Sequence, residues 1–336
     1  MKLLYTIGSL ALLAPLAAHA QTQQPIGSML HIEIENATGY ISDCPNSQLA
    51  TSASKLDRPL GPAFETAFGI GDIVSVNGRP VKGTAYSTVL ASIVGSPNPV
   101  PRGALVDLPR TALQQWDLDF VNPDGTAIGT IQISGMNGGP PPPGAPKEIG
   151  GGAYTVIAGT GAFFGVRGYF QPVQDRTVGE RVTSACEDPA FRRVNAEGRG
   201  KRHPVLYLVP MTRPEILITP TGPAIIHASD YSFVTAAKPA EPGEILTLYA
   251  SGLGPTRPGV DPGQPFTSDP PQTVNSPVEV LVNGKAAEVL YAGGYAGAVD
   301  GYQVNFRIPD GTASGQAFIQ LTSAWIMGSA VKIPVR

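Results

Sequence analysis

The sequence predicts an all-β protein of two domains, and three observations lead to this expectation. Glycine and proline together supply 74 of the 336 residues without a strict repeat, a composition typical of many turns between short strands. Short stretches alternate between apolar and polar residues, and helical periodicity does not develop. The chain length suits about two domains. The sequence pattern changes after a proline-bounded segment, and this change divides the chain after the signal into 21–213 and 214–336.

The first twenty residues read as a secretory signal peptide. Lys2 supplies a positive start, Leu3 to Ala17 carry no charge, and Ala18-His19-Ala20 has the small-x-small pattern of a cleavage site. The apolar run is short for a membrane span and a polar stretch follows at once. We therefore expect a soluble protein that is secreted or periplasmic, with no transmembrane segment.

The first domain contains strand signals in regular succession. Residues 30–35 alternate cleanly, residues 73–76 run into the Asn77-Gly78 turn signal, and residues 116–121 place Trp116, Leu118 and Phe120 on one face. A dense turn at 122–125 leads to a partner strand at 128–134. The segment Tyr154–Phe170 then supplies two apolar stretches around the corner Gly159-Thr160-Gly161. This pattern favours a β-barrel or a sandwich.

Part of the first domain resembles a known barrel group. The hairpin GTGAFFGVRG, with the preceding NPDGTAIGTI and PPPGAP segments, is similar to the barrel of the allene oxide cyclase and dirigent group over about 116–170. The resemblance implies an eight-stranded barrel with a cavity for a small apolar or phenolic molecule, whose cyclisation or coupling the cavity guides.

The second domain has short strands with turns every 8–12 residues, which predicts an immunoglobulin-like β-sandwich. Clear strand signals lie at 245–250, 278–282, 302–308 and 331–335, and Asn283-Gly284 predicts a type I′ hairpin. The set PGEILTLYASGLGPT, PVEVLVNGKAAEVLYAG and YQVNFRIPDG resembles a C-terminal domain of secreted acidobacterial (Solibacter-type) proteins, related to TIG sandwiches. The resemblance covers about 216–336 and implies an accessory module without an established activity.

Charge and cysteine content exclude some classes of function. Without Lys2 the chain has 22 basic and 26 acidic side chains, which is not the balance of a nucleic-acid-binding protein. Cys44 and Cys186 are the only cysteines, and in an oxidising compartment they predict one disulfide. Neither has a second ligand at zinc spacing, so no metal site and no cofactor is expected. A basic run at 192–203 could contact anionic polysaccharide, lipopolysaccharide or a membrane surface, but we favour a solvated loop between the domains.

The candidate ligand-binding residues come from the barrel region. Arg167 lies among aromatic residues, and an arginine at a barrel mouth can orient a carboxylate or phenolic ligand. Asp117 and Asp119 are two apart on a strand, which places them on one face. The interpretation that we favour is that Arg167 pairs with one of these acids and closes the barrel, and that the acids face solvent. The full candidate set is Tyr154, Phe163, Phe164, Arg167, Asp117 and Asp119.

The motifs that carry catalysis are missing from the sequence. There is no H-E-x-x-H, G-x-S-x-G or P-loop, and three histidines remain after signal removal. We therefore expect an exported non-catalytic binding or structural protein, associated with the cell envelope or with extracellular matrix or polysaccharide. Two alternatives stay open: a barrel that guides the cyclisation or coupling of a small apolar ligand, and self-association through sheet edges.

Overall fold

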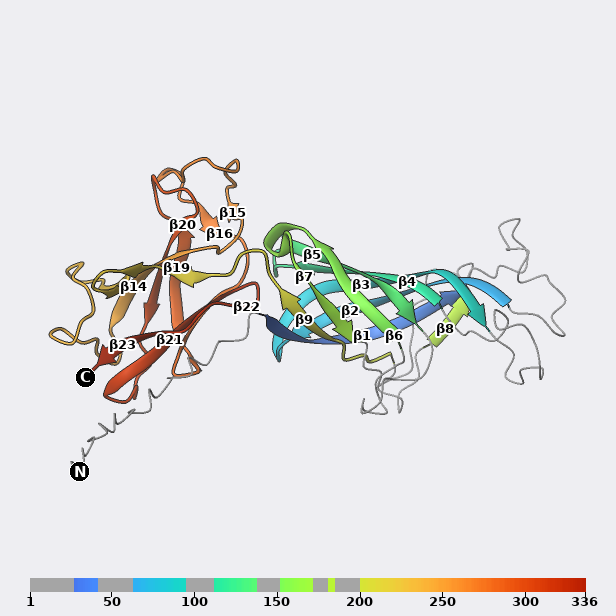
Figure 1. Cartoon of the computed structure of the whole chain (residues 1–336), viewed down its shortest axis with the longest axis horizontal. Coiled ribbons are helices and arrows are strands. Elements are labelled where there is room, and N and C mark those ends of the chain that lie inside the picture. The colour runs from blue at the N-terminus through green and yellow to red at the C-terminus, as the bar shows by residue number, and fades with distance from the viewer. Residues whose placement is uncertain (1–26, 42–62, 95–111, 138–151, 172–180, 185–199) are drawn as a thin grey trace, which may run out of the picture.

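The computed structural model describes residues 27–41, 63–94, 112–137, 152–171, 181–184 and 200–336. The expected signal peptide, Cys44 and Cys186 lie outside these residues, so the cleavage and the disulfide stay predictions. The described chain forms two units that lie end to end (Figure 1). The last strand of the first unit ends at Val209, and the first strand of the second begins at Glu215.

The first unit is a closed antiparallel barrel of eight strands. Each strand pairs with its neighbours in the order β2-β3-β4-β5-β6-β7-β9-β1, and β1 pairs with β2 to close the sheet. A further short strand, β8 (Arg181–Ser184), pairs parallel to the end of β1. The barrel strands are β1 (Ser28–Ile41), β2 (Ala63–Val76), β3 (Arg79–Val94), β4 (Ala112–Val121), β5 (Ala127–Asn137), β6 (Gly152–Gly159), β7 (Arg167–Gln171) and β9 (Val205–Val209).

The strands close into a barrel because their inward faces are apolar. Leu30, Ile32 and Ile34 of β1 are buried, and so are Trp116, Leu118 and Phe120 of β4. Successive side chains of a strand point to opposite faces, so the intervening residues face outward. The alternation predicted for these two strands is confirmed.

Two tight turns follow the sequence signal. Asn77 and Gly78 join β2 to β3 with positive φ values of 52° and 74°, and Asn283 and Gly284 have 50° and 79°, as a type I′ turn requires. The corner before β7 differs from the expected continuous hairpin. Here Gly161–Phe163 forms a short 3₁₀-helix, labelled η2.

The second unit consists of two main antiparallel sheets and a small hairpin. The first sheet contains β10 (Glu215–Ile216), β13 (Ile225–His227), β14 (Ile245–Ser251), β15 (Thr256–Arg257), β16 (Thr273–Val274), β19 (Glu288–Gly294) and β20 (Gly301–Arg307). The second contains β17 (Val278–Val282), β18 (Lys285–Ala286), β21 (Gly315–Ser323), β22 (Ile326–Met327) and β23 (Val331–Val335). The hairpin pairs β11 (Ile218–Thr219) with β12 (Gly222–Pro223).

Both main sheets of the second unit contribute to one apolar core. Leu246 and Leu248 of β14 belong to the same buried cluster as Val280 of β17 and Ile319 of β21. The all-β class is confirmed, and so is a closed barrel as its first unit. Among the described residues, no helix has the length and apolar character needed to cross a membrane.

Candidate functional site

Side chains fill the described part of the barrel interior. Phe120 and Phe163 pack with ring centroids 5.4 Å apart, and Trp116 and Phe170 pack at 5.3 Å. Arg202 lies over the ring of Trp116 at 5.3 Å, and a void of only about 10 Å³ adjoins the two side chains. Arg202 is half-buried, so the expectation that the whole basic run is solvated was wrong at this residue.

Two of the predicted ligand residues point into this interior. The Tyr154 hydroxyl donates a hydrogen bond of 2.8 Å to Oε1 of buried Gln114, and burial raises the pKa of Tyr154. Phe163 is completely buried and packs on Phe120. Both side chains belong to the core of the barrel.

The other four predicted residues lie on the outside of the barrel. Asp119 accepts a hydrogen bond of 2.5 Å from Thr130 Oγ1, and Asp117 faces the same way on β4. Phe164 is 71% exposed. The exposed Arg167 donates from Nη1 to the carbonyl of Val166 at 2.9 Å. The fold therefore does not bring the six predicted residues together at one place.

Arg167 belongs instead to an outer-wall patch, formed by Arg167, Tyr169 and Tyr207. Residues 167 and 169 share the outer face of β7, because side chains two apart lie on the same side of a strand. Tyr169 pairs with Tyr207 of β9 in the strand register. The two rings stack with centroids 5.4 Å apart, and Tyr169 is 51% exposed. The patch therefore combines two stacked phenol rings with a cation.

A tryptophan from the second unit closes one mouth of the barrel. Ala324 and Trp325 form the two-residue turn between β21 and β22, with positive φ values of 48° and 62°. Trp325 reaches the barrel core, where its ring stacks on Phe163 at 6.4 Å and packs against Phe120 at 5.5 Å. Only 8% of this residue is exposed.

Hydrogen bonds hold the two units in this arrangement. Asn122 Nδ2 donates to the carbonyl of Asn275, and Asn275 Nδ2 donates to the carbonyl of Ala127, both at 2.7 Å. The backbone N–H of Met327 donates to Ser28 Oγ at 2.9 Å. The first two bonds join the segment between β4 and β5 to Asn275 of the second unit, and the third joins β22 to the start of β1.

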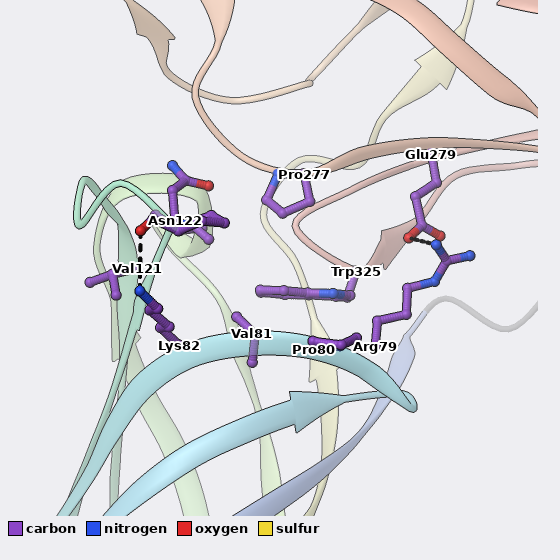
Figure 2. Close-up of a pocket in the computed structure, with 11 residues that line it drawn as sticks. Arg79, Pro80, Val81, Lys82, Val121, Asn122, Pro277, Glu279 and Trp325 are labelled. Atoms are coloured by element: carbon purple, nitrogen blue, oxygen red, sulfur yellow. Dashed lines mark hydrogen bonds and ion pairs between the residues drawn. The ribbon is translucent and has the colours of Figure 1, made fainter.

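A junction cleft of about 610 Å³ lies beside Trp325, between the two units. Figure 2 shows Trp325 between Val81 of the barrel and Pro277 of the second unit. The cleft is lined by Arg79, Pro80, Val81, Lys82, Val121, Asn122, Pro123, Ile128, Pro277, Glu279 and Trp325. Most of this lining is apolar, and both units contribute to it.

Three charged side chains line the junction cleft. Arg79 and Glu279 form an ion pair of 2.7 Å across the two units. Burial raises the pKa of Glu279, although the nearby Arg79 acts in the opposite direction. Lys82 Nζ donates to the carbonyl of Pro123 at 3.3 Å. The described residues contain no cluster of three or more histidine, cysteine or acidic side chains that could hold a metal ion.

Sequence reasoning missed both the cleft and Trp325. The turn Ala324-Trp325 lacks the Asn-Gly or Asp-Gly signal of a type I′ hairpin. The available signal was an aromatic residue at the tip of a hairpin without a glycine, where the backbone needs positive φ values. The chain matches no family model, no curated protein and no solved structure. Function is therefore argued from the geometry of this chain.

Proposed function

We propose that the protein is an exported, non-catalytic binding protein that associates with anionic polysaccharide of the cell envelope. The signal-like N-terminus supports export. In this proposal the barrel is of the allene oxide cyclase and dirigent type, and the second unit is an immunoglobulin- or TIG-like accessory module. The closed eight-stranded barrel and the two sheets around one core are compatible with these assignments.

The outer-wall patch carries the proposal. The stacked rings of Tyr169 and Tyr207 present an amphipathic surface, on which the apolar C–H face of a sugar ring can pack. Arg167 on the same face offers a guanidinium that can bind a carboxylate through two parallel hydrogen bonds. A sugar acid presents both an apolar face and a carboxylate. A polysaccharide of such sugars is extended and can lie along the outer face of β7 and β9.

The alternative function places a small apolar ligand inside the barrel and guides its cyclisation or coupling. The filled interior argues against it, because Phe120, Phe163, Phe170 and Trp116 occupy the space such a ligand would need. Trp325 also closes the mouth that faces the second unit. The resemblance of the hairpin at 154–170 still favours this alternative.

Affinity electrophoresis of the secreted chain in gels with alginate or neutral pullulan tests the proposal. We expect alginate to retard the protein more than pullulan does. Tyr169→Ala should weaken both interactions by about twofold to tenfold, since an aromatic contact contributes about 0.5–1.5 kcal/mol. Arg167→Gln should weaken only the alginate interaction. Tyr231→Ala is the matched control, because Tyr231 is 77% exposed on the second unit.

Two results would contradict the proposal. Migration unaffected by either polysaccharide would remove anionic polysaccharide as the partner. Retardation by alginate that neither Tyr169→Ala nor Arg167→Gln reduces would remove the outer-wall patch as the binding surface. Circular dichroism of each variant checks that the strands remain folded.

A further inference from the structure

The junction cleft has the size and lining of a small-molecule site. Its volume of about 610 Å³ lies within the range of about 300–1,000 Å³ in which ligand pockets usually fall. Val81, Val121 and Ile128 come from the barrel, and Pro277 and Trp325 come from the second unit. An apolar ligand of modest size would bury its body against these five side chains.

The charges around the cleft favour an anionic ligand. Arg79 is engaged by Glu279, so these two charges compensate each other. Lys82 donates to one backbone carbonyl, and within the described parts of the chain no carboxylate pairs with it. An ammonium group carries three donors. Lys82 therefore leaves donors and one positive charge available in the cleft (Figure 2).

We propose that the junction cleft binds a small apolar carboxylate, with its carboxylate at Lys82 and its apolar body against Val81, Pro277 and Trp325. The ligand touches both units, so its binding strengthens their association. This site is separate from the outer-wall patch: the cleft residues belong to the barrel mouth and the second unit, whereas the patch lies on β7 and β9. Failure of polysaccharide binding would leave this inference untouched.

Titration calorimetry with octanoate and with cinnamate tests the ligand class, and octanol serves as the neutral counterpart of octanoate. We expect saturable binding of at least one carboxylate, and the stronger one identifies an acyl or an aromatic preference. A hydrogen bond to a charged group contributes about 1.5 kcal/mol or more, which is about tenfold in affinity. Octanol should therefore bind about tenfold more weakly than octanoate if the acyl ligand is preferred.

Lys82→Gln should lower the affinity for the preferred carboxylate about tenfold and leave the affinity for octanol unchanged. The matched control is Lys285→Gln, because Lys285 is an exposed lysine of β18 that does not line the cleft. Equal carboxylate affinity in the wild type and Lys82→Gln would overturn the role of Lys82. Absence of saturable binding of both carboxylates up to millimolar concentration would overturn the site.

The indole N–H resonances of the ¹⁵N-labelled protein give the position of the ligand. The chain has two tryptophans, and Trp325→Phe assigns their signals. We expect the Trp325 signal to shift with the saturation curve seen by calorimetry, and the Trp116 signal in the barrel interior to stay in place. A saturable ligand that shifts Trp116 and leaves Trp325 unchanged would place binding in the barrel and refute the cleft assignment.

Discussion

Replacing Trp325 with alanine should strongly destabilise the barrel, although the residue belongs to the second unit. The side chain is almost completely buried in the barrel core and packs on Phe120 and Phe163. Its removal leaves a hole at one barrel mouth and removes an apolar contact between the two units. We therefore expect both units to lose stability together.

The magnitude follows from the burial and the backbone of this residue. A buried tryptophan contributes about 4–6 kcal/mol through its apolar area, and truncations of this kind cost about 3–5 kcal/mol. Trp325 has a φ of +62°, and a left-handed backbone costs about 1–2 kcal/mol for any residue except glycine. Trp325→Ala retains that strain and Trp325→Gly relieves it. We expect losses of about 4 kcal/mol for alanine and about 1 kcal/mol less for glycine.

Urea unfolding followed by tryptophan fluorescence measures this effect. In Trp325→Ala the remaining tryptophan is Trp116, which lies inside the barrel and reports on barrel unfolding. The control is Tyr231→Ala, because Tyr231 also has a positive φ of 62° but is 77% exposed. A loss below 1 kcal/mol for Trp325→Ala, or one no larger than in the control, would refute the reasoning.

Three further predictions concern other parts of the chain. Gly168→Ala should lower the stability measured in thermal melts by about 3 kcal/mol or more, since a Cβ there overlaps a carbonyl oxygen of β9. Gly125→Ala is the control: Gly125 has open space around it, so its replacement should cost about 1 kcal/mol, and equal costs for the two variants would contradict the overlap. The paired strands β1 and β8 end at Ile41 and Ser184, three residues before Cys44 and two residues before Cys186. We therefore expect a Cys44–Cys186 disulfide, so that thiol labelling in denaturant detects no free thiol before reduction and loss of the bond costs about 3–5 kcal/mol of stability; two reactive thiols would exclude this disulfide. Hydrogen bonds from Thr126 and then Arg257 hold the pKa of Asp124 below its ordinary value, so the contribution of Asp124 to stability is present above about pH 4 and is lost as pH falls through the folded pKa. Asp124→Asn should therefore reduce the fall in melting temperature at acid pH, and an unchanged fall would argue against this contribution.

Local patterns predicted much of the barrel. The alternation in β1 and β4 correctly indicated which side chains face the core, because residues two apart must share a face of a strand. The Asn-Gly pairs correctly predicted two turns, since their backbone needs positive φ at both positions. Strand faces and tight turns depend on residues that are neighbours in the sequence, so local patterns are sufficient to predict them.

The candidate site depended on contacts that local patterns do not contain. Phe163, in η2, is buried, whereas its neighbour Phe164 is exposed, so the two rings do not line one site. Alternation places Val166 and Arg167 on opposite sides of the chain without saying which one is buried. In the structure Val166 is buried and Arg167 is exposed. Trp325 packs on Phe120 from about 200 positions further along the chain. Neither the pattern around Phe120 nor the pattern around Trp325 indicates that these two side chains meet.

The tryptophan that closes the barrel mouth also sets the order in which this protein can finish folding. Trp325 follows all eight barrel strands in the sequence, and chains emerge from the amino end first. The eight strands of the barrel are therefore all synthesised before the side chain that completes their core. Until that side chain arrives, Phe120 and Phe163 face an open mouth, and a chain truncated after the barrel keeps this aromatic surface permanently available for aggregation.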